Sequence, residues 1–558
     1  MRQCLLTLEE NIPWSQSRLW DWQATFFARA GVAAWADKVP FYVTSNSVIA
    51  HSYAQIITRY IQDLSRQLGN DAQRTVHVIE LGAGTGQFSY YCLCHLVRLY
   101  QRLRLPNKPC YVMTDFAQAN LDFWQSQPLF KPFIEEGFLD MALFDVDSPQ
   151  PLFLQHRQRF LSAAEPESAV VCLANYVFDS TRHDVFHIKD QELKEGLVSL
   201  LIPSADGQGQ ETAPSLSDVS LSFTLRGIDP RTYYANAAWS AVLTDYGQDK
   251  GLEGHFVFPT AMFRALEFLE QIGSGRLLLI SSDKGYTTPQ QIMGRGPPKL
   301  THHGSFSITV NYDAVRRYVK VRGGLSFPAP PGAGLRTCVY ALGSGPDDLL
   351  ESAAAVDIFV QQYGPYDCYQ LSRHLRKSPL LSLSAGVAHL RSGHWDPYLV
   401  SSIRQQLLES LKESPNDEWK TALHDGLLQA EKLIYPLPGM RDYYFDLATL
   451  QAALADTKSA IRLLRASLQR FPECFASYFN LGLCYSRSGD SQSATAAFEK
   501  ARQYEKVEVD GPLQLRLEAE KQTPKVSSLR PSGAAPASVA PQSSAAPGVR
   551  APRRNPQH

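Results

Sequence analysis

The chain has 558 residues, of which 44% are hydrophobic and 20% charged, and this length and composition predict several domains with ordinary buried cores. Its formal net charge of −1 gives no overall attraction to nucleic acid or to an acidic membrane surface, so neither is expected as a partner. The nine cysteines show no metal-ligand spacing, and no apolar run reaches the ~18 residues of a membrane-spanning helix, so we expect a cytoplasmic protein without a metal site.

The chain begins MRQCLLTLEENIPW, with acids where a signal peptide needs an apolar core, so no signal peptide is expected. We expect residues 1–70 to form a helical segment of the first domain and residues 71–344 to form its main body.

The stretch VHVIELGAGTGQFSYY contains a short apolar run that ends in Glu80, and Gly82, Gly84 and Gly86 follow at alternate positions. A dinucleotide fingerprint would need its third glycine where Gln87 stands. The glycines allow a ligand close to the backbone, and the helix start that follows suits an anion. An acid followed by three such glycines is typical of class I S-adenosylmethionine (SAM) methyltransferases; the alternative is a tight strand–helix turn without a ligand.

Acids also follow the next two predicted strands. In KPCYVMTDFAQANLDFW the apolar run ends at Asp115, whose carboxylate could hold both hydroxyls of a ribose or could cap the next helix. In LDMALFDVD, Asp145 is the candidate for an adenine contact, although Asp140 and Asp147 compete with it.

Two further strands complete an alternating pattern. SAVVCLANYVFDS becomes polar at Asn175, and GRLLLISSDKGY follows the helix-like TAMFRALEFLEQIG. This alternation predicts an α/β fold, a doubly wound, parallel, Rossmann-like sheet. Ligands bind such sheets at the carboxyl ends of the strands, where Glu80, Asp115, Asp145 and Asn175 all fall.

A polar excursion interrupts this pattern at about residues 193–234. EGLVSLLI and LSFTLRGI flank a polar loop and predict a hairpin insertion. Such excursions often cover an active site.

Four segments in order resemble one family: PFYVTSNSVIAHSYAQIITRYI, IELGAGTGQF, LANYVFDS and LLLISSDKGY. Over about residues 20–325 the chain is similar to the MidA-like SAM-dependent methyltransferases, which include the mitochondrial complex I assembly factor that methylates a protein arginine. The resemblance implies SAM as cofactor and places Thr44 and Ser45 in its site. Two positions depart from the family: Tyr176 replaces a Glu, and Lys284 interrupts an Asp-Tyr-Gly motif.

Methyl transfer needs donor and acceptor aligned more than it needs activation, because the sulfonium is already reactive. If the acceptor is a guanidinium, its pKa above ~12 calls for acidic partners that orient it and take its proton. Asn175 and Asp179 are the candidate catalytic residues, one for positioning and one for charge. Asp179 could equally be a helix cap.

From about residue 345 the sequence predicts helices with a core of their own. Identical residues recur at an offset of 34 positions, which is the period of tetratricopeptide repeats. The matched pairs are Tyr444 with Tyr478, Leu447 with Leu481, Asp456 with Asp490 and Ala460 with Ala494. We expect a helical domain over residues 345–510, with repeats at about 441–474 and 475–508. It could dock a protein partner or simply buttress the enzyme. Residues 521–558 predict a disordered, basic tail rich in Pro, Ala and Ser.

The sequence therefore predicts a SAM-dependent methyltransferase that acts on a protein side chain, with arginine possible and the repeats choosing the partner. The alternative is a catalytically weak SAM-binding scaffold or assembly factor that works through its repeats. A small-molecule methyltransferase is a third hypothesis. The sequence predicts no oligomeric state.

Overall fold

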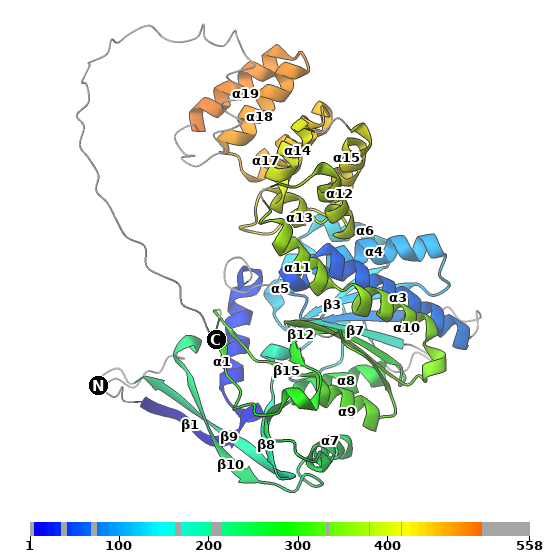
Figure 1. Cartoon of the computed structure of the whole chain (residues 1–558), viewed down its shortest axis with the longest axis vertical. Helices are drawn as coiled ribbons and strands as arrows, with labels where there is room; N and C mark the ends of the chain where they lie inside the picture. The colour runs from blue at the N-terminus through cyan, green and yellow to red at the C-terminus, as the bar shows by residue number, and fades with distance from the viewer. Residues whose placement is uncertain are drawn as a thin grey trace, which may run out of the picture. The chain divides into compact units, whose positions relative to one another are not determined.

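The computed structural model describes residues 5–34, 42–68, 75–161, 169–203, 215–302, 304–330, 334–378, 380–413 and 416–504. They fall into two compact units that divide after Pro472 (Figure 1). The tail expected at residues 521–558 lies outside the described residues.

An eight-stranded sheet forms the centre of the first unit, in the order β16-β17-β12-β7-β2-β3-β4, with β15 paired to β12. The strands are β2 (Val76–Leu81), β3 (Pro109–Asp115), β4 (Leu139–Leu143), β7 (Ala169–Asn175), β12 (Leu277–Tyr286), β15 (Val310–Asn311), β16 (Leu325–Phe327) and β17 (Leu335–Leu342). The five strands from β4 to β12 are parallel, which confirms the predicted α/β sheet. The prediction is wrong at one edge, where β17 runs antiparallel to β12 and to β16.

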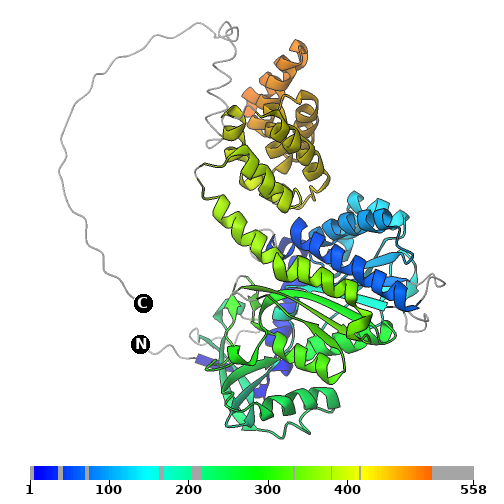
Figure 2. The ribbon, with the colours of Figure 1, turned by 45° about the vertical axis from the view of Figure 1, so that its right-hand side comes forward.

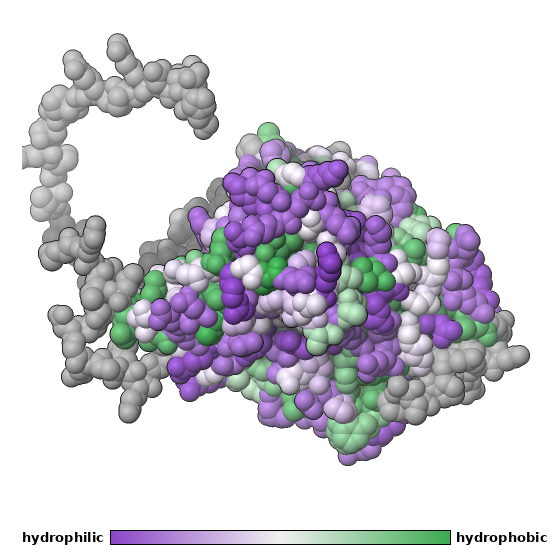
Figure 3. Space-filling model, turned by 90° about the horizontal axis from the view of Figure 1, so that it is seen from below, coloured by the Kyte–Doolittle hydropathy of each residue, from purple (hydrophilic) through white to green (hydrophobic). Residues whose placement is uncertain are grey.

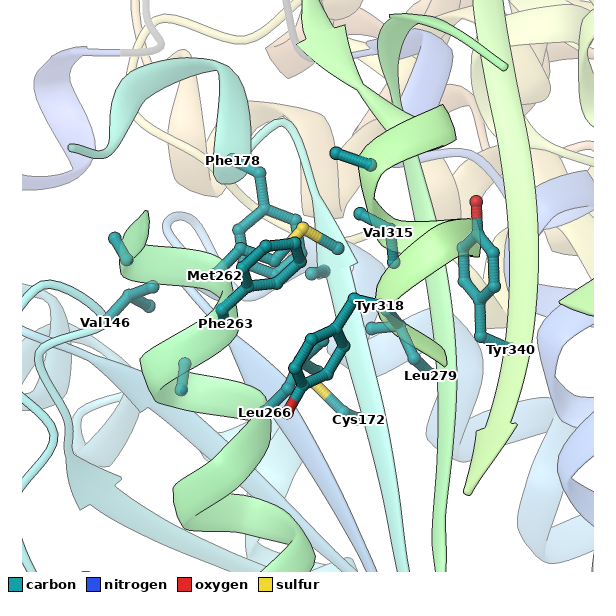
Figure 4. Packing of buried hydrophobic residues seen from close by; sticks show 14 of the residues in the cluster. Val146, Cys172, Phe178, Met262, Phe263, Leu266, Leu279, Val315, Tyr318 and Tyr340 are labelled. Atoms are coloured by element: carbon teal, nitrogen blue, oxygen red, sulfur yellow. The ribbon is translucent and has the colours of Figure 1, made fainter. Parts of the chain in front are cut away.

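Helices cover both faces of this sheet, because successive residues of a strand point to opposite sides. On β2, Ile79 and Leu81 join the core under α8 and α9, while Val76 and Val78 join the core under α3, α4 and α10. These helices are α3 (Ser47–Leu68), α4 (Gln87–Leu103), α8 (Thr260–Ile272), α9 (Tyr312–Val321) and α10 (Leu350–Val356). Figure 4 shows the first core, in which Met262, Phe263 and Leu266 of α8 and Val315 and Tyr318 of α9 face Cys172, Leu279 and Tyr340 of the sheet.

A second, five-stranded sheet is entirely antiparallel, in the order β1-β9-β8-β11 with β10 also paired to β9. Its strands are β1 (Leu5–Pro13), β8 (Asp184–Lys189), β9 (Glu192–Pro203), β10 (Ser220–Gly227) and β11 (Gly254–Phe258). The pairing of β9 with β10 confirms the predicted hairpin. The prediction of a helical N-terminus is wrong for β1, because its partner β9 lies almost 190 residues away in the chain and local sequence cannot reveal it. The expected helical character holds for α1 (Leu19–Ala30) and α3.

The helices after the sheet belong to the same compact unit as the sheet as far as Pro472, and segments before α11 and after α15 join its core. These helices are α11 (Pro365–Leu375), α12 (Leu383–Ser392), α13 (Pro397–Ser402), α14 (Arg404–Glu413), α15 (Asp417–Lys432), α16 (Tyr443–Ala453) and α17 (Thr457–Arg470). Leu349, Val356, Val360, Leu433 and Tyr435 belong to the core under α3 and α4, and α10 lies along α3 (Figure 2). The boundary between the compact units therefore lies after Pro472 and not at residue 345, where the sequence predicted it.

The second unit contains the helix pair α18 (Phe475–Arg487) and α19 (Ser491–Tyr504). The two helices approach closely at Gly482, where an added Cβ would lie 2.6 Å from the ring of Phe498. A larger residue than glycine would therefore push the pair apart.

The remaining elements of the described chain connect these layers. They are α5 (Gln118–Gln125), α6 (Lys131–Glu135), α7 (Ala237–Gln248), β5 (Phe153–Leu154), β6 (Arg159–Phe160), β13 (Thr301–His302) and β14 (Phe306–Ser307), with a π-helical turn at Asp357–Gln362 and short 3-10 turns elsewhere. No described helix is both long and apolar enough to cross a membrane. The face seen in Figure 3 is mostly hydrophilic, and its hydrophobic residues lie in separate small areas.

Hydrogen bonds from the start of α10 to Asp63 hold α10 against α3. The buried carboxylate of Asp63 accepts hydrogen bonds from the backbone N–H of Glu351 (3.1 Å) and from both the N–H and the hydroxyl of Ser352 (2.7 Å each). Asp63→Ala should lower the free energy of unfolding by about 3 kcal/mol, because buried donors lose their acceptor. Chemical denaturation measures this loss. Glu351→Ala, which keeps the backbone donor, should change stability by less than about 0.5 kcal/mol; equal losses in the two variants would contradict the role of Asp63.

Candidate functional site

The loop between β2 and α4 has a backbone that three glycines make possible. Gly82, Gly84 and Gly86 have φ angles of +59°, +54° and +76°, in the left-handed region. The N–H of Gly86 bonds to the carbonyl of Ala83 (2.8 Å), which closes a turn with positive φ at its first central residue, the pattern of a type II′ turn. An added Cβ at Gly86 would also lie 2.9 Å from the end of the Met113 side chain and 3.1 Å from the indole of Trp124, so close packing adds to the preference for glycine.

Side chains from outside the loop fix its backbone. The N–H of Gly84 donates to the Asp115 carboxylate (3.1 Å), and the indole of Trp124 donates to the Gly84 carbonyl (2.9 Å). The hydroxyl of Tyr435 donates to the carbonyl of Thr85 (2.9 Å). Three side chains distant in sequence therefore hold two consecutive residues of the loop.

A cavity opens beside this loop at the carboxyl ends of the strands. Its empty space is about 820 Å³ with the open mouth included. The residues that line it are Phe27, Thr44, Ser45, Glu80, Gly82, Ala83, Gly84, Thr85, Phe88, Asn175, Tyr176, Asp179, Ser180, Lys284, Ser305, Phe306 and Ser307. The structure thus brings together seven of the ten candidate site residues of the sequence analysis, from three separate segments.

Three other candidates lie outside that lining. Gly86 is the last residue of the turn, and Asp115 is buried behind the loop, where it also accepts from the N–H of Ala117 (3.0 Å). Asp145 is exposed beyond the end of β4, and its carboxylate accepts from the N–H of Asp147 (2.9 Å). Contacts of Asp115 with ribose and of Asp145 with adenine stay predictions.

Glu80, at the end of β2, faces the cavity from a buried position. Its carboxylate accepts hydrogen bonds from the hydroxyls of Ser89 and of Tyr111, the latter at 2.7 Å. Burial raises the pKa of Glu80 to about 7, although both hydrogen bonds oppose the shift. The charge of this acid therefore changes near neutral pH.

Asn175 is held by a tyrosine that the sequence did not indicate. The hydroxyl of Tyr53 on α3 donates to the Asn175 side-chain oxygen (2.7 Å) and lies 2.7 Å from the hydroxyl of Ser282. The Asn175 amide nitrogen in turn donates to the carbonyl of Thr44 (3.4 Å). Tyr53 lies among the apolar residues of a long helix, and its spacing there is that of an ordinary core residue.

Asp179 and Asp283 form a buried pair of acids beside the cavity. The Asp179 N–H donates to the Asp283 carboxylate (3.1 Å), and the two side chains also interact. Burial raises the pKa of Asp179 to about 7 against the pull of the Lys284 cation, and burial with the Asp179 charge holds the pKa of Asp283 well above its usual range. Such a pair titrates as one unit and holds a shared proton near neutral pH. The sequence signal for Asp283 was an acid within the apolar strand LLLISSDKGY.

Tyr176 stands at the same end of the cavity with a strained backbone. Its φ is +52°, uncommon for a residue other than glycine, and its N–H bonds to the carbonyl of Ser282 (3.0 Å). Tyr176 and its neighbours Asn175 and Asp179 all line the cavity.

The residues present fit SAM, which carries an ammonium, a sulfonium and a carboxylate. Glu80 offers a carboxylate to the cations, and the N-terminus of the 17-residue helix α4 suits the anion. The positive φ angles let the loop backbone approach the ligand without intervening side chains. Among the described residues, no group of three His, Cys, Asp or Glu side chains could hold a metal ion.

Comparisons with known proteins agree with this fit. Residues 56–280 match the model of a family described as "Putative S-adenosyl-L-methionine-dependent methyltransferase". A comparison with curated proteins finds no match.

Two crystal structures from Burkholderia thailandensis are similar. One, titled an "uncharacterized" superfamily protein, is 15% identical, with coverage of 61% of this chain and 97% of that chain and a TM-score of 0.31. The other, titled a "likely methyl transferase" bound to S-adenosyl-homocysteine, is 17% identical, with coverage of 62% and 90% and a TM-score of 0.29. Scores of this size do not establish a shared fold, and the assignment rests on the family-model match. By that match this protein is a SAM-dependent methyltransferase, and SAM is its cofactor.

Replacing Gly84 tests whether the loop binds the cofactor. Gly84→Val should weaken SAM binding at least about tenfold, because a left-handed φ costs a β-branched residue ~1–2 kcal/mol and the turn must distort. Calorimetry with SAM measures the change. Gly251→Val is a matched control. Gly251 also has a positive φ (+76°), but a Cβ added there would have no atom within 4 Å, and Gly251 does not line the cavity. Normal affinity in Gly84→Val would remove the loop from the cofactor site.

The pKa of Glu80 predicts how SAM binding depends on pH. Below about pH 7 Glu80 takes up a proton and loses the negative charge that faces a cationic ligand. SAM affinity should therefore fall several-fold between about pH 8 and about pH 6, as measured by calorimetry. In Glu80→Gln the affinity should be lower and this dependence absent. A slope that persists in Glu80→Gln would assign it to another group.

Proposed function

We propose that the protein transfers a methyl group from SAM to a protein side chain that enters the cavity beside Asn175 and Asp179. The observation that carries this proposal is the buried acid pair of Asp179 and Asp283, which lies at the same cavity as the glycine loop. An enzyme that needs to orient an acceptor and take its proton has use for such a pair. A protein that only binds the cofactor has no use for such an acid pair.

Asn175 is the positioning group in this proposal. Tyr53 occupies its side-chain oxygen and the Thr44 carbonyl its amide, so the side chain is held in one orientation at the end of β7. The oxygen has a second lone pair that can accept a hydrogen bond from an acceptor nitrogen. Tyr53 thus supports Asn175 from the side of α3.

In this proposal, the acid pair of Asp179 and Asp283 accepts the proton that the acceptor nitrogen loses. SAM supplies the methyl group on a positively charged sulfur. As the acceptor nitrogen forms its bond to carbon, it must lose one proton, and a carboxylate with a pKa near 7 can accept it at neutral pH. Asp283 keeps the shared proton in place beforehand, and Asp179, which lines the cavity, is the member that faces the acceptor.

Arginine is one acceptor that this arrangement supports, because a carboxylate can both balance a guanidinium charge and remove its proton. Lys284 counts against it, since its cation lies at the same cavity and already interacts with Asp179. A neutral acceptor nitrogen would avoid that repulsion. The proposal therefore commits to a protein side chain and leaves arginine as one member of the class.

Partner choice is assigned to the helices after the sheet. The two helix pairs α16–α17 and α18–α19 carry the residues that match at an offset of 34, and each is a helical hairpin. Their 34-residue offset resembles that of tetratricopeptide repeats, whose role in this proposal is to hold a peptide of the protein substrate. The same docking role would serve a SAM-binding assembly factor with little catalysis. Tyr176 and Lys284, which depart from the family pattern, favour this alternative.

Labelled SAM tests the proposed function directly. The wild-type protein is incubated with labelled SAM and a lysate of its own organism, and proteins are separated from small molecules. A labelled protein band supports the protein methyltransferase. Label in small molecules alone favours the small-molecule alternative, and binding of SAM without any transfer favours the scaffold.

Removing the charge of Asp179 should slow transfer but spare cofactor binding. Asp179→Asn should lower kcat about 100-fold, the size typical of one lost acid–base group, with the SAM Kd within about twofold of wild type. Asp283→Asn should have a similar effect, because the two acids share a proton. Glu270→Gln is the control, since burial also raises the pKa of Glu270 but it lies on α8 outside the cavity lining. Wild-type rates in Asp179→Asn would contradict the assigned role.

A further inference from the structure

We propose that Tyr435, which follows helix α15, is a positioning residue for cofactor binding: its hydroxyl fixes the glycine loop from behind. This inference rests on the proposed function only in taking the glycine loop as the SAM site. It assigns part of that site to a segment well outside residues 56–280, the part of the chain that matches the methyltransferase family.

The segment LIYPL, residues 433–437 between α15 and α16, is called the strap here. Leu433, Ile434 and Tyr435 are all buried, and the ring of Tyr435 lies 5.6 Å from that of Tyr90 and 5.9 Å from that of Phe130. The strap is therefore packed into the core of the sheet domain and does not lie on its surface.

The Tyr435 hydroxyl reaches the glycine loop at its turn. It donates to the Thr85 carbonyl at 2.9 Å, and a Cβ added at Gly86 would lie 3.0 Å from the same oxygen. Trp124 binds the preceding carbonyl, that of Gly84, at 2.9 Å. Neither Tyr435 nor Trp124 lines the cavity, so both hold the loop from the side away from the ligand.

These two bonds decide which way the peptide groups of the turn face. A glycine-rich turn has several accessible backbone conformations, because Gly84 and Gly86 tolerate both signs of φ. A buried carbonyl that loses its donor costs ~1–3 kcal/mol, so the Thr85 carbonyl keeps its partner as long as Tyr435 has a hydroxyl. Without it, only the bond from the Gly86 N–H to the Ala83 carbonyl (2.8 Å) holds the Thr85–Gly86 peptide, and the loop presents a less fixed surface to SAM.

A bond to Lys432, the last residue of α15 and the neighbour of the strap, provides a control. The Tyr90 hydroxyl donates to the carbonyl of Lys432 at 2.7 Å, at the same interface between α4 and the strap. This bond joins α4 to the end of α15, directly before the strap, and does not touch the glycine loop. Tyr90→Phe and Tyr435→Phe each delete one hydroxyl that is bonded to a main-chain carbonyl, and they differ in whether that carbonyl belongs to the loop.

The experiment uses the full-length chain and S-adenosyl-homocysteine as the probe, with calorimetry for Kd and thermal unfolding for stability. Tyr435→Phe should raise the Kd about tenfold, the effect of one lost hydrogen bond. Tyr90→Phe should change it less than twofold with a similar shift in Tm. In turnover assays Tyr435→Phe should raise the KM for SAM and leave kcat near wild type. Trp124→Phe, which frees the neighbouring carbonyl, should resemble Tyr435→Phe in binding.

Hydrogen exchange without ligand gives a readout that does not depend on the proposed function. Amides of residues 82–87 should exchange faster in Tyr435→Phe than in wild type and be unchanged in Tyr90→Phe. Equal exchange and equal Kd in Tyr435→Phe and wild type would overturn the positioning role. Equal losses of binding in Tyr435→Phe and Tyr90→Phe would also overturn it, because they would reflect the interface and not the loop. If wild type binds no S-adenosyl-homocysteine but the exchange differs as expected, the proposed function fails and the tie between strap and loop stands.

Discussion

The site depends on one constraint, the left-handed backbone of Gly82, Gly84 and Gly86 between β2 and α4. Such a backbone is possible only without side chains, and glycine alone does not choose among the conformations it permits. The choice comes from hydrogen bonds made by Asp115 and other distant side chains to main-chain atoms of the loop. The residues that permit the loop and the residues that fix it are therefore different ones.

The same cavity collects acids whose burial is unfavourable for stability. Burial raises the pKa of Glu80 and of Asp179 to about 7, and burial with the Asp179 charge holds the pKa of Asp283, beside the cavity, well above its usual range. A carboxyl group in such a position binds its proton near neutral pH, where an ordinary surface acid would stay ionised. Perturbed acids that gather at one cavity are typical of a chemical site more than of a structural one. In the proposed function they respond to a cationic cofactor and to the proton released by an acceptor.

The helices after the sheet have two kinds of relation to this site. Those up to α17 share a compact unit with the sheet, and Tyr435 and Asp396 reach the segments around the cavity. Asp396 accepts from the N–H of Ser47 at 2.8 Å and so holds the start of α3, next to Thr44 and Ser45. The pair α18–α19 forms its own unit. In the proposed function, the segments before α16 complete the cofactor site, and the helix pairs α16–α17 and α18–α19 take the partner.

The sequence by itself determined the alternation of strands and helices, the glycine loop and the strand-end positions of Glu80 and Asn175. These features depend on local patterns: apolar runs, an acid at their end and glycines at fixed offsets. Five of the eight strands in the main sheet and the β9–β10 hairpin followed from such patterns.

Tertiary structure alone decided the rest. Tyr53, Asp283 and Tyr435 lie in ordinary core patterns, and their roles appear only because α3, β12 and the strap converge on one cavity and one loop. The strand β1 needs a partner almost 190 residues away, which no local pattern contains. Predicting such features requires knowing which distant groups meet, because a hydrogen bond or a shared proton depends on distances of a few ångströms that only the folded chain sets.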